Sequence, residues 1–322
     1  TNDTRGQIRR FEYQGTLRAG ASTELTFGAE TEKQKIRNIG QWDLEPLKAD
    51  VDTHSVYAQG QTTLFERLTL TAGVRHDDHD TFGAHTTFRV AGAYRIEASD
   101  TLLRANWGEG FKARSLYQVY SAYGNADLEA ETSDGWEAGF DQGFVDGRIR
   151  VSATWFEQKL KNQIDYVPCT GGDLMCGPGR YGYYDNVGRA SFKGVELGLL
   201  LQPVDALVIK ANYTWLEPLN RVTDTDLARR ARDIFQTSVN WAATARTNFS
   251  ASLVMVGDSY DSPGNANRLD GYTLVDVRAS HALTPGLEVY GRIDNLFDVD
   301  YEVIRGYGTM GRGVYLGLRA RY

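Results

Sequence analysis

The sequence predicts an all-β protein whose antiparallel strands wrap into a transmembrane β-barrel. Three observations lead to this fold class. Apolar and polar residues alternate along many segments, short turns alternate with long connections, and the chain ends on an alternating segment whose last residue is aromatic. A period of two is typical of strands. An apolar side toward lipid and a polar side toward a wet lumen is the pattern of outer-membrane barrels.

Composition excludes membrane-spanning helices and disfavours a general nucleic-acid binder. The mean hydropathy is -0.43, and no run approaches the roughly 18 consecutive apolar residues that a membrane helix needs. Barrel strands place their apolar residues at every second position, so this polarity is compatible with a membrane. The formal net charge of -7 differs from the basic face that nucleic-acid binders normally carry.

The alternating segments follow one another along the whole chain. The first strand begins near residue 6, and the clearest later strands cover residues 68–75, 148–155, 207–215, 249–255, 287–294 and 312–322. We count about fifteen strands, whereas bacterial single-chain barrels have even strand numbers. We therefore expect residues 1–322 to be the C-terminal portion of one barrel domain of the 22-stranded class with a plugged lumen. Roughly seven strands and the plug would then be missing.

The last segment carries the barrel pattern most clearly. Its apolar face holds Val314, Leu316, Leu318, Ala320 and Tyr322, and its other face holds Tyr315, Gly317, Arg319 and Arg321. A terminal aromatic within the pattern suits a closing strand at a membrane interface.

The connections between strands also alternate in length. Tight turns are predicted at residues 65–67, 97–100, 145–147, 202–205, 244–247 and 284–286. Long connections are predicted at about residues 36–52, 76–84, 112–132, 163–185, 217–232, 258–270 and 298–312. Short turns on one rim and long loops on the other describe an outer-membrane barrel. A soluble β-sandwich is the alternative, although it does not require this asymmetry.

Two cysteines and the start of the chain bear on the compartment. Cys169 and Cys176 lie close together with no second cysteine pair or histidine to complete a metal site, so we expect a loop disulfide, with two free thiols as the alternative. A disulfide indicates an oxidising compartment. The first residues are polar and carry no signal peptide, so we expect either a mature form or a missing beginning.

Three motifs resemble TonB-dependent outer-membrane receptors. The first is Asn106-Trp-Gly-Glu-Gly-Phe-Lys-Ala-Arg-Ser-Leu-Tyr-Gln-Val-Tyr120 followed by residues 124–137, the second is residues 184–196, and the third is Asp294-Asn-Leu-Phe-Asp-Val-Asp-Tyr-Glu302 followed by residues 306–315. The resemblance runs from about residue 66 to the end of the chain. The family normally has Pro where Arg114 stands and often Pro where Ala130 stands, so we expect a less rigid loop here.

Within that family, two stretches look most like the cobalamin (corrinoid) receptors: residues 298–303 with Gly306-Tyr and Gly311-Arg, and residues 223–232. The resemblance implies active import of a scarce large ligand, energised by the inner-membrane TonB complex through a plug that this chain lacks. It also implies contact with outer-membrane lipid and lipopolysaccharide, and recognition of the last strand, with Gly317, Ala320 and Tyr322, by the barrel-assembly machinery.

Other functions stay open as alternatives. A ferric-siderophore receptor of the same family is the nearest, and a passive porin or an outer-membrane barrel enzyme comes from a different class. We find no Gly-x-Ser-x-Gly elbow, phosphate loop or dinucleotide fingerprint, and the resemblance implies no enzyme. No nucleic acid, cofactor or metal is expected, and calcium is an alternative that the sequence does not support.

Loop aromatics are the candidate ligand contacts, because flat amphipathic rings bury much area at small entropic cost. The candidates are Tyr117, Tyr120, Tyr123, Tyr183, Tyr260 and Tyr307, with Tyr181, Tyr184 and Tyr301 beside them. An aromatic girdle or loop packing is the alternative role for these rings.

Charged residues are expected inside the barrel, since a charge facing lipid at the midplane costs about 2 to 4 kcal/mol. Alternation places these arginines inward: Arg10, Arg75, Arg89, Arg104, Arg150, Arg278, Arg292 and Arg319. The cluster from Arg75 to Asp80, with His85, is expected to be a solvated strand exit rather than a metal or catalytic site. Asn295, Asp298 and Asp300 are expected to form a turn, with a cation site as the alternative.

Glycines also fall inside predicted strands, among them Gly194 and Gly317. Glycine weakens a strand unless close approach or sharp curvature requires it. We expect these glycines to relieve strain in a tilted sheet, with close packing near the wall as the alternative.

Overall fold

Antiparallel strands account for most of the chain. The computed structural model describes residues 3–40, 45–81, 83–169, 175–177 and 180–321. The first nine strands are β1 (Asp3–Ala19), β2 (Thr23–Ile39), β3 (Leu47–Leu64), β4 (Leu68–His79), β5 (Gly83–Ile96), β6 (Thr101–Lys112), β7 (Glu131–Phe144), β8 (Ile149–Pro168) and β9 (Gly182–Val204). The others are β10 (Leu207–Asn220), β11 (Thr225–Asp226), β12 (Asp233–Thr244), β13 (Thr247–Val256), β14 (Ser259–Ser262), β15 (Ala266–Leu269), β16 (Tyr272–Thr284), β17 (Leu287–Asp294) and β18 (Gly313–Ala320).

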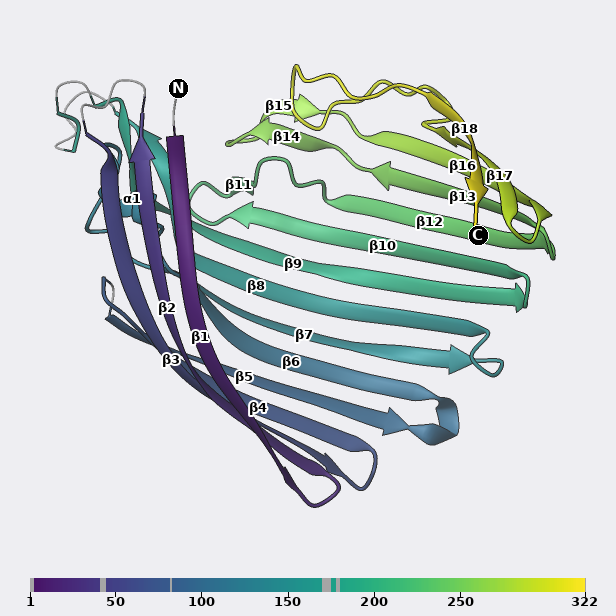
Figure 1. Cartoon of the computed structure of the whole chain (residues 1–322), viewed down its shortest axis with the longest axis horizontal. Helices are drawn as coiled ribbons and strands as arrows, with labels where there is room; N and C mark the ends of the chain where they lie inside the picture. Colours follow the sequence, from purple (N-terminus) through teal and green to yellow (C-terminus); the bar gives the residue numbers. More distant parts are fainter. Residues whose placement is uncertain (1–2, 41–44, 82, 170–174, 178–179, 322) are drawn as a thin grey trace. The chain divides into compact units, whose positions relative to one another are not determined.

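One sheet takes up sixteen of these strands, and each long strand pairs with its neighbour in the sequence (Figure 1). The path runs β1 to β10, then β12, β13, β16, β17 and β18, with the short β11 paired to β10. The path itself has fifteen strands, in agreement with the number expected from the sequence. The short hairpin β14–β15 forms a separate sheet. A sandwich would need two packed sheets, so the up-and-down order confirms the barrel class.

The chain divides into two compact units, which we describe separately. The first contains residues 1–94, 104–136 and 158–190, and the second contains residues 95–103, 137–157 and 191–322. In the first unit, β1 to β5 pair in long unbroken registers, such as Arg10 opposite Glu32 and Tyr57 opposite Arg75. In the second, β10, β12, β13, β16, β17 and β18 pair in the same way.

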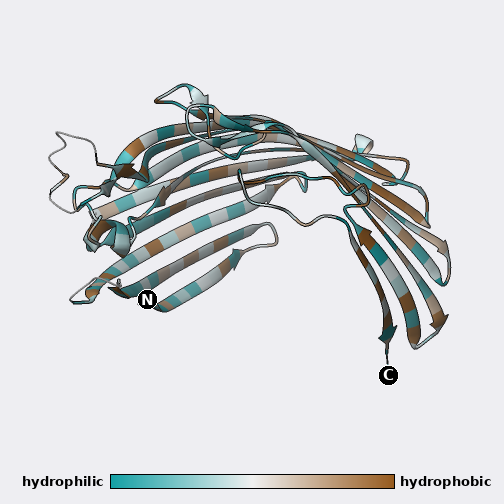
Figure 2. Ribbon diagram, turned by 90° about the horizontal axis from the view of Figure 1, so that it is seen from above, coloured by the Kyte–Doolittle hydropathy of each residue, from teal (hydrophilic) through white to brown (hydrophobic). Residues whose placement is uncertain are grey.

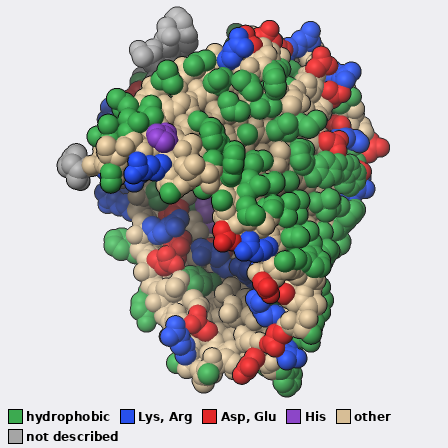
Figure 3. Space-filling model, turned by 90° about the vertical axis from the view of Figure 1, so that its right-hand side faces the viewer, with side chains coloured by type: hydrophobic (Ala, Val, Ile, Leu, Met, Phe, Trp, Pro, Cys, Tyr) green, Lys and Arg blue, Asp and Glu red, His purple; other side chains and the backbone are tan. Residues whose placement is uncertain are grey.

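Each strand has an apolar face and a polar face, as the alternation predicts. Figure 2 shows hydrophobic and hydrophilic residues alternating along single strands, and Figure 3 shows hydrophobic side chains gathered apart from the charged ones. The apolar face is exposed: Phe11 is 75% exposed, Leu316 84% and Leu318 68%. A sandwich would bury Leu316 and Leu318. An exposed apolar band of this kind suits contact with lipid.

Buried apolar side chains of the described residues lie mostly in the connections and near the ends of strands. In the described part of the first unit they include Leu116, Leu128 and Ile164, and in the second Pro218, Ala231 and Leu269. The sheet is therefore held by its ladders and its two faces, while hydrophobic clusters fix the connections.

The predicted turns are confirmed, but several long connections are shorter than expected. Short turns join β3 to β4, β9 to β10, β12 to β13 and β16 to β17. The β2–β3 connection covers residues 40–46 rather than 36–52, and the β4–β5 connection covers residues 80–82 rather than 76–84. The ladders between β2 and β3 and between β4 and β5 extend into residues that were expected to be loops.

Two short helices occur where the sequence indicated none: η1 (Glu97–Ser99), a 3-10 turn, and α1 (Leu116–Tyr120). Helix α1 begins at a capping box in which the Ser115 and Gln118 side chains each accept a hydrogen bond from the other residue's backbone N–H. No described helix has the length and apolarity required to cross a bilayer.

Candidate functional site

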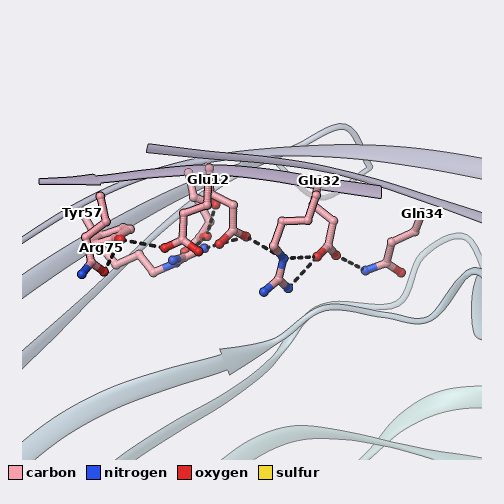
Figure 4. Close-up of polar contacts among 10 residues, drawn as sticks. Glu12, Glu32, Gln34, Tyr57 and Arg75 are labelled. Atoms are coloured by element: carbon pink, nitrogen blue, oxygen red, sulfur yellow. Dashed lines mark hydrogen bonds and ion pairs between the residues drawn. The ribbon is translucent and has the colours of Figure 1, made fainter. Parts of the chain in front are cut away.

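The polar face of β1 to β4 carries a connected set of ion pairs (Figure 4). The Arg10 guanidinium donates to Glu32 at 2.6 Å and lies 3.7 Å from Glu30. Arg75 reaches Glu30 at 3.4 Å and Asp77 at 2.9 Å. The pairing follows from register, because Arg10 lies opposite Glu32 across the ladder. The inward, ion-paired wall expected from the sequence is confirmed here.

Neutral groups extend this set along the same face. The Tyr57 hydroxyl donates to Glu12 at 2.7 Å and contacts Gln14 at 3.0 Å, and the Arg75 guanidinium lies 5.7 Å from the Tyr57 ring centroid. A glycine at position 28 leaves room for the Tyr57 ring, since a side chain there would overlap it. The result is a polar wall in which the named carboxylates outnumber the guanidinium groups, and Glu12, Tyr57 and Arg75 also line a cavity of about 440 Å³.

Tyrosine rings meet near the loop ends of the first unit. Tyr117 of α1 lies edge to face with Tyr184 at 6.3 Å, Tyr184 with Tyr166 at 6.0 Å, and Tyr166 with Tyr123 at 5.8 Å. These four residues are called the tyrosine cluster below. Edge-to-face geometry within about 7 Å is a favourable arrangement for aromatic rings. The cluster provides ring faces and hydroxyl edges that suit a bulky ligand with polar margins.

Arg114 fixes the connection that carries Tyr117 and Tyr123. It is 8% exposed and donates to the carbonyl oxygens of Thr81, at 2.7 Å, Ala126, at 2.7 Å, and Leu128. Burial lowers the pKa of this guanidinium below its ordinary value. The arginine ties three backbone carbonyls together where the family normally has proline, and these hydrogen bonds oppose the less rigid loop expected from the sequence.

Asn186 holds the other side of the same connection. Its side-chain oxygen accepts from the Glu129 backbone N–H at 2.6 Å, and its amide donates to the carbonyls of Glu129 and Asn162. The backbone N–H of Tyr184 also donates to the carbonyl of Tyr123 at 2.9 Å. These hydrogen bonds hold residues that are far apart in the sequence beside one another. They fix the connections that carry the rings of the tyrosine cluster.

The six predicted ligand tyrosines do not all come together. Tyr117 and Tyr123 belong to the cluster, Tyr120 lies on the same helix as Tyr117, and Tyr183 is buried with the Arg180 guanidinium 5.5 Å from its ring. Tyr260 and Tyr307 lie in the second unit, Tyr260 on β14 and Tyr307 exposed in the β17–β18 connection. The sequence interpretation missed Tyr166, which falls on β8, although its position near the end of that strand is a signal for loop proximity.

The structure also locates the predicted disulfide, the His/Asp cluster around β4 and the predicted turn at Asn295 and Asp298. Cys169 and Cys176 form the predicted disulfide, with 5.7 Å between their Cα atoms. Around β4, His76 lies on the exposed row while Asp77 and His79 lie on the buried row, so the predicted cluster is split between two faces. Asn295 and Asp298 take left-handed φ angles of 49° and 56° and form a turn closed by hydrogen bonds from the backbone N–H groups of Val299 and Arg312.

The last strand follows its predicted alternation. Gly317 lies opposite Tyr290 and leaves room for that ring, and Ala320 ends β18 opposite Leu287. Tyr322 lies outside the described residues.

Comparison with known proteins assigns the family. The family model for the TonB dependent receptor-like β-barrel matches residues 1–296. A vitamin B12 transporter, BtuB, of Photobacterium profundum is 30% identical over 302 residues, and the BtuB of Vibrio vulnificus is 30% identical over 288. The alignments cover 91% and 88% of this chain and 46% and 44% of those proteins.

Solved structures agree on the fold. The ferric enterobactin receptor PfeA of Pseudomonas aeruginosa, in its G324V mutant form, superposes with a TM-score of 0.82 at 22% identity, over 99% of this chain and 54% of that one. The siderophore receptor PirA of Acinetobacter baumannii gives 0.83 at 16% identity, over 98% and 55%. The chain thus spans about half the length of the proteins it matches. It belongs to the TonB-dependent receptor family, and its strands are part of a β-barrel of the bacterial outer membrane.

Proposed function

We propose that the protein imports a scarce large ligand, a cobalamin or a related corrinoid, across the outer membrane, with energy supplied by the TonB complex. The observation that carries this proposal is the 30% identity to two vitamin B12 transporters over about nine-tenths of the chain. The siderophore receptors are less similar in sequence, at 22% and 16%. Their likeness therefore bears on the fold and not on the ligand.

The tyrosine cluster supports a bulky ligand with polar margins. Tyr117, Tyr123, Tyr166 and Tyr184 present rings from separate elements near the loop ends, held by Arg114 and Asn186. A corrinoid has a flat macrocycle edged by amides, and such a shape favours ring contacts and hydroxyl hydrogen bonds. We propose these residues as ligand contacts: Tyr117, Tyr120, Tyr123 and Tyr183, with Tyr184 beside them, in this unit, and Tyr260 and Tyr307 in the second.

Membership of the TonB-dependent receptor family supports a proposal about the partners of the protein. We propose that the TonB complex acts through a plug domain and that lipid and lipopolysaccharide cover the apolar face. We also propose that the barrel-assembly machinery recognises the last strand, with Gly317, Ala320 and Tyr322. The exposed band that includes Phe11 and Leu316 supports the lipid contact.

Ligand titration of outer membranes that contain the protein tests the proposal. Cyanocobalamin is expected to bind saturably, and ferric enterobactin is expected to show no saturable binding. Tyr184→Ala is expected to weaken cobalamin binding about tenfold, since one ring contact is worth about 0.5 to 1.5 kcal/mol beyond the area it buries. Tyr181→Ala is the matched control, because this neighbouring tyrosine is exposed and lies outside the cluster.

The reverse preference, with tight ferric-chelate binding and no response to cobalamin, would replace the corrinoid by a siderophore. Saturable binding of neither ligand, with passive uptake of small solutes, would favour the porin alternative.

A further inference from the structure

The outward face of β1, β2 and β3, in the first unit, carries basic side chains next to its apolar band. Alternation and register put Phe11, Tyr13 and Phe27 on this face, and all three side chains are exposed. Nearer the β2–β3 connection the same face changes from apolar to basic. Its cations, called the outer basic patch below, are Arg5, Arg9, Lys33, Lys35, Arg37 and Lys48.

The patch lies apart from the ion pairs described above. Arg10 and Glu32 alternate with the patch residues along β1 and β2, so they lie on the opposite, polar face of these strands. A plug or an imported ligand inside the barrel would meet that polar face. The outer basic patch faces the membrane side instead.

The register lines up like charges across the three strands. Arg5 of β1 lies opposite Arg37 of β2, which in turn lies opposite Lys48 of β3. Like charges that face each other across a strand pair are unfavourable. Asp3 lies 3.4 Å from both Arg5 and Arg37 and offsets part of this charge. An external anion bound over the row would offset more of it.

The other carboxylates of these strands on the outward face are engaged by a single lysine. The Lys33 ammonium lies 2.9 Å from Asp50 and 2.5 Å from Asp52. Lys35 lies opposite Asp50 in the ladder, but Asp50 is already bonded to Lys33.

Exposed cations therefore remain available in the patch. Arg9, Lys35 and Lys48 are all exposed, and no carboxylate of the described residues forms an ion pair with any of them. Lysine and arginine side chains that project freely from a surface bind phosphate oxygens through charge-assisted hydrogen bonds.

The height of the patch matches that of lipid headgroups. Arg9 follows Phe11 on the same face of β1, two residues nearer the end of the strand, and Arg5 is six residues from Phe11. A strand rises about 3.3 Å per residue, so the cations lie about 7 to 20 Å along the strand from the apolar band. They also lie toward the β2–β3 connection, which is longer than the β1–β2 turn at the other end. Longer connections mark the extracellular rim, so the patch is at the level of the outer leaflet.

We propose that the outer basic patch binds the phosphate groups of lipopolysaccharide, whose acyl chains then cover Phe11, Tyr13 and Phe27. Basic residues beside a membrane surface attract anionic headgroups in this way. The proposal rests on the lipopolysaccharide contact proposed above and gives it a place on the protein. It does not depend on which ligand is imported.

Titration with lipid A that carries both of its phosphate groups tests the patch, with the protein in detergent micelles and native mass spectrometry as the readout. The unchanged protein is expected to bind this lipid saturably, and to bind lipid A without phosphate at least tenfold more weakly. Lys35→Gln and Lys48→Gln are each expected to weaken binding about fivefold, the effect of one basic residue near a charged membrane surface. Arg67→Gln removes the same charge from the β3–β4 turn, outside the patch, and is expected to leave binding unchanged.

A second variant tests the patch with every cation in place. Gln7 lies opposite Lys35 in the β1–β2 ladder, so Gln7→Glu would give Lys35 a carboxylate of its own. This variant is expected to weaken lipid A binding about fivefold or more. Gln14→Glu is the matched control, because it makes the same change in the same strand on the polar face, where Gln14 contacts the Tyr57 hydroxyl. Heat-modifiable mobility on a denaturing gel monitors the folding of all variants.

Three results would overturn the proposal. They are the absence of saturable lipid A binding, undiminished binding by Lys35→Gln, Lys48→Gln and Gln7→Glu, and equally tight binding of phosphatidylglycerol, which would make the patch a general site for anionic lipid. Cobalamin titration of the same samples separates this outcome from the proposed function. Patch variants are expected to bind cobalamin like the unchanged protein, and failure of the unchanged protein to bind cobalamin would overturn the corrinoid while the lipid A result still decides the patch.

Discussion

At the scale of single residues, Arg114 shows how one buried cation organises a long connection. Its guanidinium donates to the carbonyl groups of Thr81, Ala126 and Leu128, which lie in connections between strands. Backbone carbonyls buried without a partner are costly, so the arginine compensates for the irregular path between β6 and β7. The ordering of Tyr117 and Tyr123 depends on that path.

Replacement of Arg114 by alanine is expected to loosen this connection while the sheet remains intact. A hydrogen bond to a charged group contributes about 1.5 to 3 kcal/mol, so loss of one such bond accelerates local opening by at least about tenfold. Hydrogen exchange of the amides in residues 113–130 measures the effect.

Arg230→Ala is the matched control, because the Arg230 side chain donates to the carbonyl of Arg229, the adjacent residue. Equal exchange rates in the two variants would show that Arg114 does not hold the connection.

Sequence reasoning reached the charged wall more easily than the tyrosine cluster. Alternation places Arg10 and Arg75 on the polar face, and the register then supplies acidic partners such as Glu32. The cluster depends on connections whose paths have no period, so the sequence offered Tyr117 among the candidates but did not single out Tyr166, although that residue falls within the predicted connection at residues 163–185. The tie made by Arg114 depends on carbonyls 12 and 14 residues away.

At the scale of elements, glycines mark the places where adjacent strands approach closely. Gly194 of β9 is an example, because a Cβ at this position would overlap the carbonyl oxygen of Trp215 on β10 and the ring of Phe156. A backbone oxygen held in a ladder has little freedom to move. At Gly194 the structure therefore shows the close approach that was the alternative to strain relief.

Gly194→Ala is expected to destabilise the protein by about 1 to 3 kcal/mol, the usual cost of overpacking. Gly60→Ala in β3 is the control, since nothing lies within 4 Å of the added methyl group. Urea unfolding of both variants in the same lipid measures the difference. Equal midpoints would mean that the strands separate at Gly194 without cost.

The elements that the sequence missed are short ones. Helix α1 has five residues, too few for a helical period to be visible, and only the Ser115–Gln118 capping box indicates it. Strand ends at residues 36–39 and 47–52 were expected in a loop, although Leu47, Ala49 and Val51 alternate with polar residues. The ladder pairs residues 36–38 with residues 47–49, so this alternation was a strand signal that the sequence interpretation missed.

At the scale of the whole molecule, the two faces of the strands decide where the protein lies. The apolar face is exposed, with Phe11 and Leu316 among its side chains, and the polar face holds the ion pairs of β1 to β4. In water such an apolar surface would be a liability. We propose that lipid covers this surface in the bilayer and takes the place of the core that the sheet lacks.

A pair of adjacent substitutions in β4 tests this assignment. Ala72 lies on the exposed apolar face, and Thr71 lies on the polar face, where its hydroxyl donates to Gln61. Ala72→Arg is expected to cost about 2 to 4 kcal/mol near the bilayer midplane, and Thr71→Arg is expected to cost within about 0.5 kcal/mol. Both add the same side chain to the same strand, so composition and charge are matched. Urea unfolding in lipid vesicles, followed by tryptophan fluorescence, measures the two values. Equal costs would mean that hydrocarbon does not distinguish the faces, and the apolar band would then need another partner.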